Sequence, residues 1–410
     1  MLARISQLIK SVSHGTSEFY RARAAITQRL IEKHDFNVVA IEGDWPDAHA
    51  IDRFVRQTPI SKSLAKEPIF KHFPRWMWRN TEVQEFVHWL GKRNATLNPS
   101  KRAGFYGLDL YSMASSIRAV IEYLEKKDPD TAEVAKRRYA CLQPWAEDPQ
   151  KYGLVALSKG YAPCEKEVVS ILNDLLRKRL ELAQKDGEEY LDAEFNARVI
   201  RDAERYYRAM YYGGAESWNC RDQHMFDTLT RLLKCKPQSK AVVWAHNSHV
   251  GDARYTAMGS RGEFNIGQLC RQYFVQPGEL AIIGCSTHSG TVAASDGWDM
   301  PMKIKDVIPS REDSYEFVMH STGISSFLLD LKPTPRNEEI IQALQRPRRE
   351  RFIGVVYKSE LELWSHYSKA ILPKQFDALV WFDQTTAVHA FETAQPKESL
   401  SIEDTYPFGL

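Results

Sequence analysis

Two histidines stand three residues apart, directly after a short apolar run in the second half of the chain. His246 and His249 follow the segment AVVWA at residues 241–245. A short apolar run with β-branched residues and polar borders is typical of a buried strand. In open α/β sheets, binding and catalytic residues gather outside the carboxyl ends of the strands. Imidazoles at that position act as proton-transfer groups, oxyanion donors or metal ligands, and the pair predicts one of these roles.

The same arrangement, an apolar strand that leads to an ionisable residue, occurs three more times in the sequence. The pairs of segment and following residue are 38–41 with Glu42, 104–108 with Asp109, and 280–284 with His288. The carboxyl ends of parallel strands meet at one edge of a sheet, so these side chains predict a shared site there.

A further histidine lies near the amino terminus, in the segment SHGT at residues 13–16. His14 precedes a helix that we expect to begin near Ser17. The positive end of the helix dipole disfavours a protonated imidazole. A histidine that stays neutral near pH 7 can accept a proton as a general base. A helix-capping role fits the same position equally well.

The helix after His14 carries a guanidinium on its apolar face. Arg23 shares the stripe formed by Phe19, Ile26 and Leu30 at helical spacing. A charged group on a core-facing stripe needs an anionic partner or a cavity, unless it reaches solvent at the edge of the stripe. Glu42 is expected to emerge at the end of its strand, where its carboxylate can hold a histidine or Arg23 in place, or orient a water molecule.

Two other kinds of site, a metal centre and a nucleophilic serine, can be weighed against the same sequence. His246, His249, Glu42 and Asp109 together would make a plausible metal set. The chain has no dense metal motif such as HExxH or HxHxD, and no GxSxG nucleophile elbow. We therefore expect no metal and no cofactor, and direct attack by an activated water as the leading scheme. A metal-dependent hydrolase remains the alternative.

Composition excludes several classes of partner. The chain has 410 residues and a formal net charge of +2, which gives no electrostatic case for nucleic acid or membrane. The basic cluster RPRRER at residues 346–351 is expected to be a solvated loop. No apolar run approaches the roughly 20 residues that span a bilayer, and no secretory signal is recognised.

Cysteine usage favours a reducing compartment. The six cysteines, none of them in a CxxC pair, are Cys141, Cys164, Cys220, Cys235, Cys270 and Cys285. Scattered thiols in a chain of this size fit free cysteines better than a disulfide framework. Cys270 and Cys285 sit in apolar runs and are expected in the core. The expected location is the cytoplasm.

Alternating helices and strands predict an α/β fold with a mainly parallel central sheet, flanked by helices, and an inserted all-helical subdomain. Helices are expected at 17–33, 81–94, 113–126 and 216–233. Strands are expected at 37–41, 104–110, 241–245, 280–285, 315–320, 327–329, 352–357 and 378–382. The domain prediction is a core in two parts, 1–127 and 236–395, a helical insertion at 128–235, and a loose tail at 396–410.

Across nearly its whole length the chain resembles the erythromycin esterase family. The matching segments are SHGTSEF (13–19), VAIEGDWP (39–46), WMWRN (76–80), GFYGLD (104–109), SWNCRD (217–222), WAHNSH (244–249) and QFDA (375–378). The resemblance implies hydrolysis of a macrolide lactone, a small-molecule ester, without a covalent intermediate.

The resemblance also implies roles for residues that their positions had already singled out. The family's general-base histidine falls on His14, its supporting arginine and glutamate on Arg23 and Glu42, and its paired histidines on His246 and His249. The predicted substrate-binding or supporting residues are Asp109, Arg79, Arg221 and His288.

One departure from the family pattern concerns the segment before His14. The family has a buried strand that ends in Gly-Glu-x-Thr/Ser-His, with the glutamate three residues ahead of the histidine. Ser11 occupies that position here, and residues 1–10 look more like a short amphipathic helix than a strand. On this pattern we expect the chain to start inside the family domain. The alternative function is therefore a catalytically impaired relative that acts as a binding protein.

Overall fold

The computed structural model describes most of the chain. The described residues are 6–11, 13–59, 69–70, 74–146, 148–158, 162–236 and 238–391. They divide into two compact units, one formed by 1–42, 50–106 and 233–410, the other by 43–49 and 107–232. The predicted loose tail at 396–410 lies outside the described residues.

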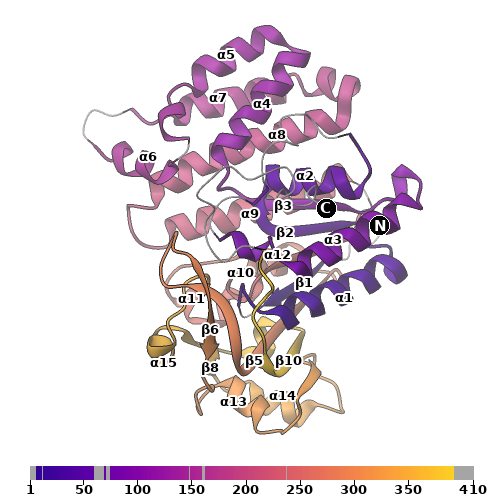
Figure 1. Cartoon of the computed structure of the whole chain (residues 1–410), viewed down its shortest axis with the longest axis vertical. Coiled ribbons are helices and arrows are strands. Elements are labelled where there is room, and N and C mark those ends of the chain that lie inside the picture. Colours follow the sequence, from indigo (N-terminus) through magenta and orange to yellow (C-terminus); the bar gives the residue numbers. More distant parts are fainter. Residues whose placement is uncertain are drawn as a thin grey trace. The chain divides into compact units, whose positions relative to one another are not determined.

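A mainly parallel sheet organises the first unit (Figure 1). Within the described residues it has eight strands, in the order β3-β2-β4-β1-β5-β10-β7, with β6 paired to β5. The strands are β1 (Ser6–Ser11), β2 (Val38–Asp44), β3 (Gly104–Asp109), β4 (Ala241–His246), β5 (Leu280–Ser295), β6 (Met302–Val307), β7 (Ser326–Asp330) and β10 (Ala378–Thr385). β1 and β2 both run parallel to β4, and β5 and β10 are also parallel. This confirms the predicted fold class.

The continuous apolar runs of the sequence form the fully buried strands. Every residue of β2, β3 and β4 is buried, as expected for parallel strands covered on both faces. Their register sets the site, because Ile41 pairs with Trp244 and Ser11 pairs with His246. Glu42, His246 and the segment after Ser11 therefore leave the sheet at the same edge.

Helices of the first unit begin and end at recognisable signals. Asn80 caps α3 by accepting a hydrogen bond from the Val83 amide, and α1 ends where Asp35 adopts a left-handed conformation, φ 57°. The helices are α1 (Ser17–His34), α2 (Trp45–Val55, shared by both units), α3 (Thr81–Ala95), α10 (Asn247–Val250), α11 (Ala257–Ser260), α12 (Ile266–Tyr273), α13 (Tyr315–His320), α14 (Glu338–Leu344), α15 (Glu362–Ser365) and α16 (Leu372–Gln375).

The second unit is helical. Its helices are α4 (Met113–Lys127), α5 (Pro129–Tyr139), α6 (Pro149–Ala156), α7 (Glu165–Arg177), α8 (Arg179–Ala209) and most of α9 (Glu216–Cys235). The apolar stripe of α7 lies in a core that also includes α4 and α8 residues. α4 packs on α5 and α8, and the longer segment of this unit is Gly107–Leu232, whereas the sequence predicts a helical insertion at 128–235.

Three predicted elements differ from the structure. Residues 1–10 were expected to resemble a helix, but residues 6–11 form β1, between β4 and β5. The run YEFVMH was expected to be a strand but forms α13, because Ser314 caps its first turn and Tyr315 and Met319 face the core four residues apart. In the segment 352–357, only Ile353 and Val356 form isolated bridges.

The basic cluster at 346–351 is not a solvated loop. Arg348–Arg351 forms β8, which pairs with β9 (Tyr367–Ala370), and Arg351 has no exposed surface. A guanidinium needs partners before it can be buried, and the sequence does not show where those partners come from.

Two of the six cysteines form a disulfide. Cys141 and Cys164, in the helical unit, are paired as a disulfide, with Cα atoms 6.1 Å apart, so the expectation that all six thiols are free is wrong for this pair. Cys270 and Cys285 are buried, as predicted. Among the described residues, no helix combines the length and the apolarity that crossing a bilayer requires.

Candidate active site at the carboxyl edge of the sheet

The loop between β1 and α1 presents His14. Its backbone is fixed at the neighbouring residue, because the Gly15 carbonyl accepts hydrogen bonds from the amides of Ala293 (3.0 Å) and Val388 (2.9 Å). A Cβ on Gly15 would lie 2.0 Å from the Ala293 carbonyl oxygen, so only glycine permits this close approach. The imidazole of His14 is consequently held in place and is 8% exposed.

Glu42, directly after the apolar run of β2, is the centre of the site. Its Oε2 accepts a hydrogen bond from the backbone amide of His246 at 2.8 Å. Its Oε1 lies 3.2 Å from His249 Nε2 and 3.9 Å from His14 Nε2. One carboxylate oxygen thus faces two imidazoles, while the other oxygen fixes the orientation of the carboxylate. Glu42 is 3% exposed.

The ring of His246 is stacked on His14, with centroids 4.6 Å apart and planes at 26°. Its Nδ1 accepts from the Ser248 amide at 3.2 Å and lies 2.8 Å from the Ser248 Oγ. The amide can only donate, so Nδ1 carries no proton and the Ser248 hydroxyl donates to it as well. Its Nε2 lies 3.1 Å from the Ile353 carbonyl oxygen, which can only accept. Both contacts assign His246 the neutral Nε2–H tautomer, with both nitrogens occupied by protein atoms.

Arg23 brings a buried positive charge to the same place. Its side chain is 2% exposed, and Nη2 donates to the Ala245 carbonyl at 3.4 Å. The guanidinium lies over the ring of Tyr20, 4.9 Å from its centroid. Within the part of the chain that the structure describes, Arg23 Nε has no hydrogen-bond partner. A buried donor without a partner is costly, which points to an acceptor supplied from outside the protein.

Burial controls the protonation of His14. Loss of solvation lowers the pKa of His14 well below 6.5, assisted by His246, His249 and Arg23, while Glu42 acts in the opposite direction. His14 is therefore neutral at pH 7 and can accept a proton. The predicted cluster of His14, Arg23, Glu42, His246 and His249 is thus assembled in one unit of the protein.

The four predicted supporting residues have other neighbours. Asp109 and Arg221 form a bidentate ion pair inside the helical unit, with Arg221 Nη2 2.6 Å from Asp109 Oδ2. Arg79 is buried and donates to the Ile69 carbonyl at 3.2 Å. His288 Nδ1 lies 2.7 Å from Ser310 Oγ, and its ring stacks on His320, which is paired with Asp383. Their direct role in chemistry stays a prediction.

The geometry does not favour the metal alternative. No group of three or more His, Cys, Asp or Glu side chains among the described residues is arranged to hold a metal ion. Both nitrogens of His246 already face protein atoms, and Asp109 is paired with Arg221. The donor set that this alternative requires is therefore not free to bind.

Sequence reasoning missed several residues that support the cluster. The Tyr20 hydroxyl lies 2.9 Å from the His14 carbonyl oxygen, and Trp78 Nε1 donates to the Glu42 carbonyl at 2.9 Å. Tyr20 precedes Arg23 by three residues on α1, and this spacing was a usable signal. The Ile353 carbonyl has no such signal, because a backbone group can be recruited from any residue.

Comparisons with known proteins relate the chain to one family. The erythromycin esterase family model matches residues 31–385. Erythromycin esterase type I of Escherichia coli is 21% identical, over 79% of this chain and 81% of its own. A putative hydrolase of Bacillus subtilis, YbfO, is 21% identical over 93% of this chain and 84% of its own.

Two solved structures share the fold. A protein from Bacillus cereus superposes with a TM-score of 0.78 at 19% identity, covering 95% of this chain and 90% of its own. A mutant of the erythromycin esterase EreC in its open conformation superposes with a TM-score of 0.66 at 16% identity, covering 96% of this chain and 93% of its own.

Proposed function

The chain belongs to the erythromycin esterase family, and from this premise we propose that it is a hydrolase that cleaves a carboxylic ester by direct attack of water. One observation carries the proposal. A buried, neutral imidazole, His14, faces the same carboxylate oxygen of Glu42 as a second imidazole, His249. When this imidazole takes a proton from water, its positive charge is balanced by the negative charge of the Glu42 carboxylate.

The nucleophilic water is placed between His14 and Glu42. The 3.9 Å separation of His14 Nε2 and Glu42 Oε1 is too long for a direct hydrogen bond and short enough for one water to contact both. Such a water donates a proton to each acceptor and keeps its lone pairs for the ester carbonyl. When His14 takes the proton, the imidazolium forms an ion pair with Glu42, which offsets the cost of charge in the buried site.

Charge that develops on the carbonyl oxygen needs a donor already in place. Arg23 supplies a fixed cation whose buried Nε has no acceptor within the described residues. Preorganised donors of this kind stabilise an oxyanion without reorganisation during the reaction. His249, whose Nε2 lies 3.2 Å from Glu42 Oε1, is the candidate proton donor to the departing alkoxide. The proton that His14 took from water then replaces the one that His249 gives up, passing through Glu42 Oε1, which faces both imidazoles.

The substrate we propose is a small-molecule ester, with a macrolide lactone first, because one relative is an erythromycin esterase. The test incubates purified protein with erythromycin and a panel of p-nitrophenyl esters, with and without a chelator. We expect at least one ester to gain one water, with a rate that the chelator does not change. A protein that cleaves none of them, or that needs added metal, contradicts the proposal.

The kcat/KM for ester cleavage is expected to stay near its neutral-pH value in mildly acidic solution. Because burial lowers the pKa of His14 below 6.5, the base form survives as pH falls through 6.5 and is lost only further down. The acid limb of kcat/KM against pH should therefore lie below pH 6.5. An acid limb centred at or above 6.5 would contradict a desolvated imidazole as the base.

The identity of residue 11 favours a second candidate, a catalytically impaired relative. Ser11, in register with His246 at the end of β1, stands where the family pattern has glutamate. If this loss limits the rate, Ser11→Glu should raise kcat by about tenfold or more, within the range of general acid–base assistance. Ser11→Gln is the matched control, of similar size without charge, and should stay at the wild-type rate. Equal rates for all three proteins would remove this candidate.

A further inference from the structure

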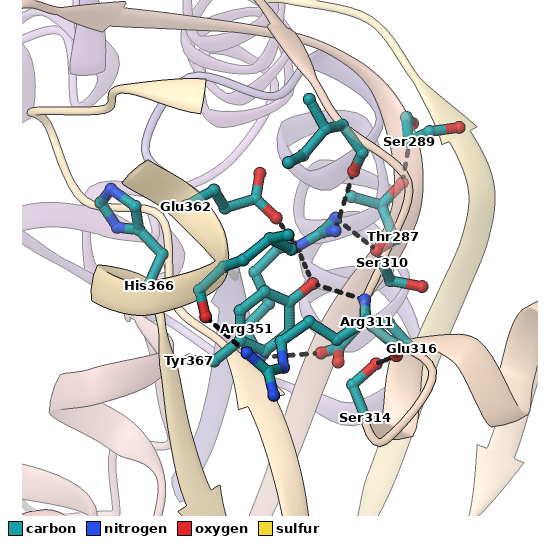
Figure 2. A network of polar contacts seen from close by, with 12 residues as sticks. Thr287, Ser289, Ser310, Arg311, Ser314, Glu316, Arg351, Glu362, His366 and Tyr367 are labelled. Atoms are coloured by element: carbon teal, nitrogen blue, oxygen red, sulfur yellow. Dashed lines mark hydrogen bonds and ion pairs between the residues drawn. The ribbon is translucent and has the colours of Figure 1, made fainter. Parts of the chain in front are cut away.

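Outside the histidine cluster, Arg351 is a buried charge that belongs to a network of polar contacts (Figure 2). Its guanidinium donates to the carbonyls of Thr287 (3.2 Å), His288 (2.9 Å) and Ile308 (2.9 Å). Its Nε donates to the Tyr367 hydroxyl at 2.8 Å. One side chain thus joins β5, β9 and the segment after β6, which is more than pairing β8 with β9 requires.

A single carboxylate anchors both ends of the segment that begins at Arg351. Glu362, on α15, places Oε1 2.9 Å from Arg351 Nε, as Figure 2 shows. Its Oε2 accepts a hydrogen bond from the Tyr357 hydroxyl. Arg351, Glu362 and Tyr357 all have no exposed surface. We call residues 351–357 the strap.

The middle of the strap meets the catalytic cluster. Ile353 forms a parallel bridge with Ser13, the residue before His14, and its carbonyl oxygen lies 3.1 Å from His246 Nε2. Further along, the Val355 carbonyl accepts from the Ser295 amide at 2.9 Å. The strap therefore contacts His246 and the residue that precedes His14.

We propose that Arg351, Glu362 and Tyr357 are positioning residues, which hold the Ile353 carbonyl against His246 and so keep His246 in its neutral Nε2–H tautomer. This inference rests on the proposed function of His14 as the base. When that carbonyl moves away, the contact that holds the proton on Nε2 is lost, and the proton can move to Nδ1. An Nδ1–H ring can no longer accept from the Ser248 amide, so His246 shifts in the stack that sets its ring 4.6 Å from the ring of His14.

The Ser248 amide holds the other nitrogen of the His246 ring. It donates to His246 Nδ1, so protonation of Nδ1 would also break the cap of α10. The ring is thus held between Ser248, whose amide and hydroxyl face Nδ1, and the Ile353 carbonyl at Nε2. Of these contacts, only the carbonyl belongs to the strap.

The test compares two buried tyrosines that differ in what their hydroxyls hold. Tyr357→Phe removes the hydroxyl that binds Glu362. Tyr315→Phe, the matched control, removes a buried hydroxyl that lies 2.9 Å from the Arg346 carbonyl and does not touch the strap. Glu362→Gln is a second variant, which keeps the volume of the side chain and changes both anchors at once.

Nitrogen-15 NMR of histidine rings reads the tautomer directly and needs no substrate. We expect wild type and Tyr315→Phe to show His246 as a single Nε2–H species. Tyr357→Phe and Glu362→Gln should show mixed tautomers, with kcat lowered about 10- to 100-fold and KM within about twofold. A His246 that stays pure Nε2–H in both strap variants overturns the inference. A wild type without esterase activity but with the expected NMR changes overturns the proposed function and leaves the strap in place.

Discussion

Replacement of His14 by alanine is expected to lower kcat for ester cleavage by about 10²–10⁴-fold, the usual contribution of a positioned acid–base group. Neither neighbouring imidazole, His246 or His249, can substitute. Both nitrogens of His246 are occupied, and His249 Nε2 faces Glu42 at 3.2 Å. The fold should survive, because the loop is held by the Gly15 carbonyl and not by the ring. Stopped assays at saturating substrate, with circular dichroism to verify folding, measure the effect.

Two controls make the result of this substitution specific. His34→Ala removes an exposed imidazole at the end of α1 and should leave kcat unchanged. Added imidazole should partly restore the rate of His14→Ala, because it can enter the space left by the ring and accept the proton. Unchanged turnover in folded His14→Ala would remove the proposed base.

Replacement of Glu42 by glutamine is the second large effect, an expected loss of about 10²–10³-fold in kcat, within the range of general acid–base contributions. The amide keeps the shape of the side chain but removes the charge that offsets an imidazolium at His14. Glu42 raises the pKa of His14 against the lowering caused by burial. Its removal should therefore lower that pKa further and move the acid limb of the rate profile to lower pH.

Glu82→Gln provides a matched comparison for this prediction. Glu82 is a buried glutamate on α3 that binds Ser17 and His389, away from the proposed chemistry. The substitution Glu82→Gln should lower the free energy of unfolding and leave the acid limb of the rate profile at the same pH as in the wild-type protein. If the acid limb of Glu42→Gln also coincides with that of wild type, the carboxylate does not act on the base.

The part of the site that follows strand ends was predictable from the sequence. Glu42 and His246 come directly after apolar runs, and a parallel sheet brings such positions to one edge. Arg23 was visible as a charge on an apolar stripe, because burial of a guanidinium demands a partner. His14 had a local reason to be neutral, although burial, and not the helix dipole, dominates its pKa.

The strap was not predictable, for a physical reason. Its contact with His246 uses the backbone carbonyl of Ile353, and a carbonyl is the same at every residue. Arg351 was assigned to a solvated loop, because its partners, Glu362 and three carbonyls, come from segments far apart in the sequence. Local composition cannot show that a charge will be satisfied by distant groups.

The errors in secondary structure have a related origin. Residues 6–11 are central in the sheet because β4 and β5 pair with them on both sides, and this pairing outweighs a weak helical pattern. In α13, the Ser314 cap and the spacing of Tyr315 and Met319 outweigh the strand propensity of its aromatic and β-branched residues. Short apolar runs fit both elements, and tertiary contacts decide between them.

The central claim is that a desolvated, neutral His14 takes the proton from water. The most direct measurement is a nitrogen-15 NMR titration of the His14 ring in the wild-type protein, set beside the pH dependence of kcat/KM. We expect a single pKa below 6.5 in both, equal within error. A His14 that titrates at 6.5 or above, or a kinetic pKa that belongs to another group, would contradict it.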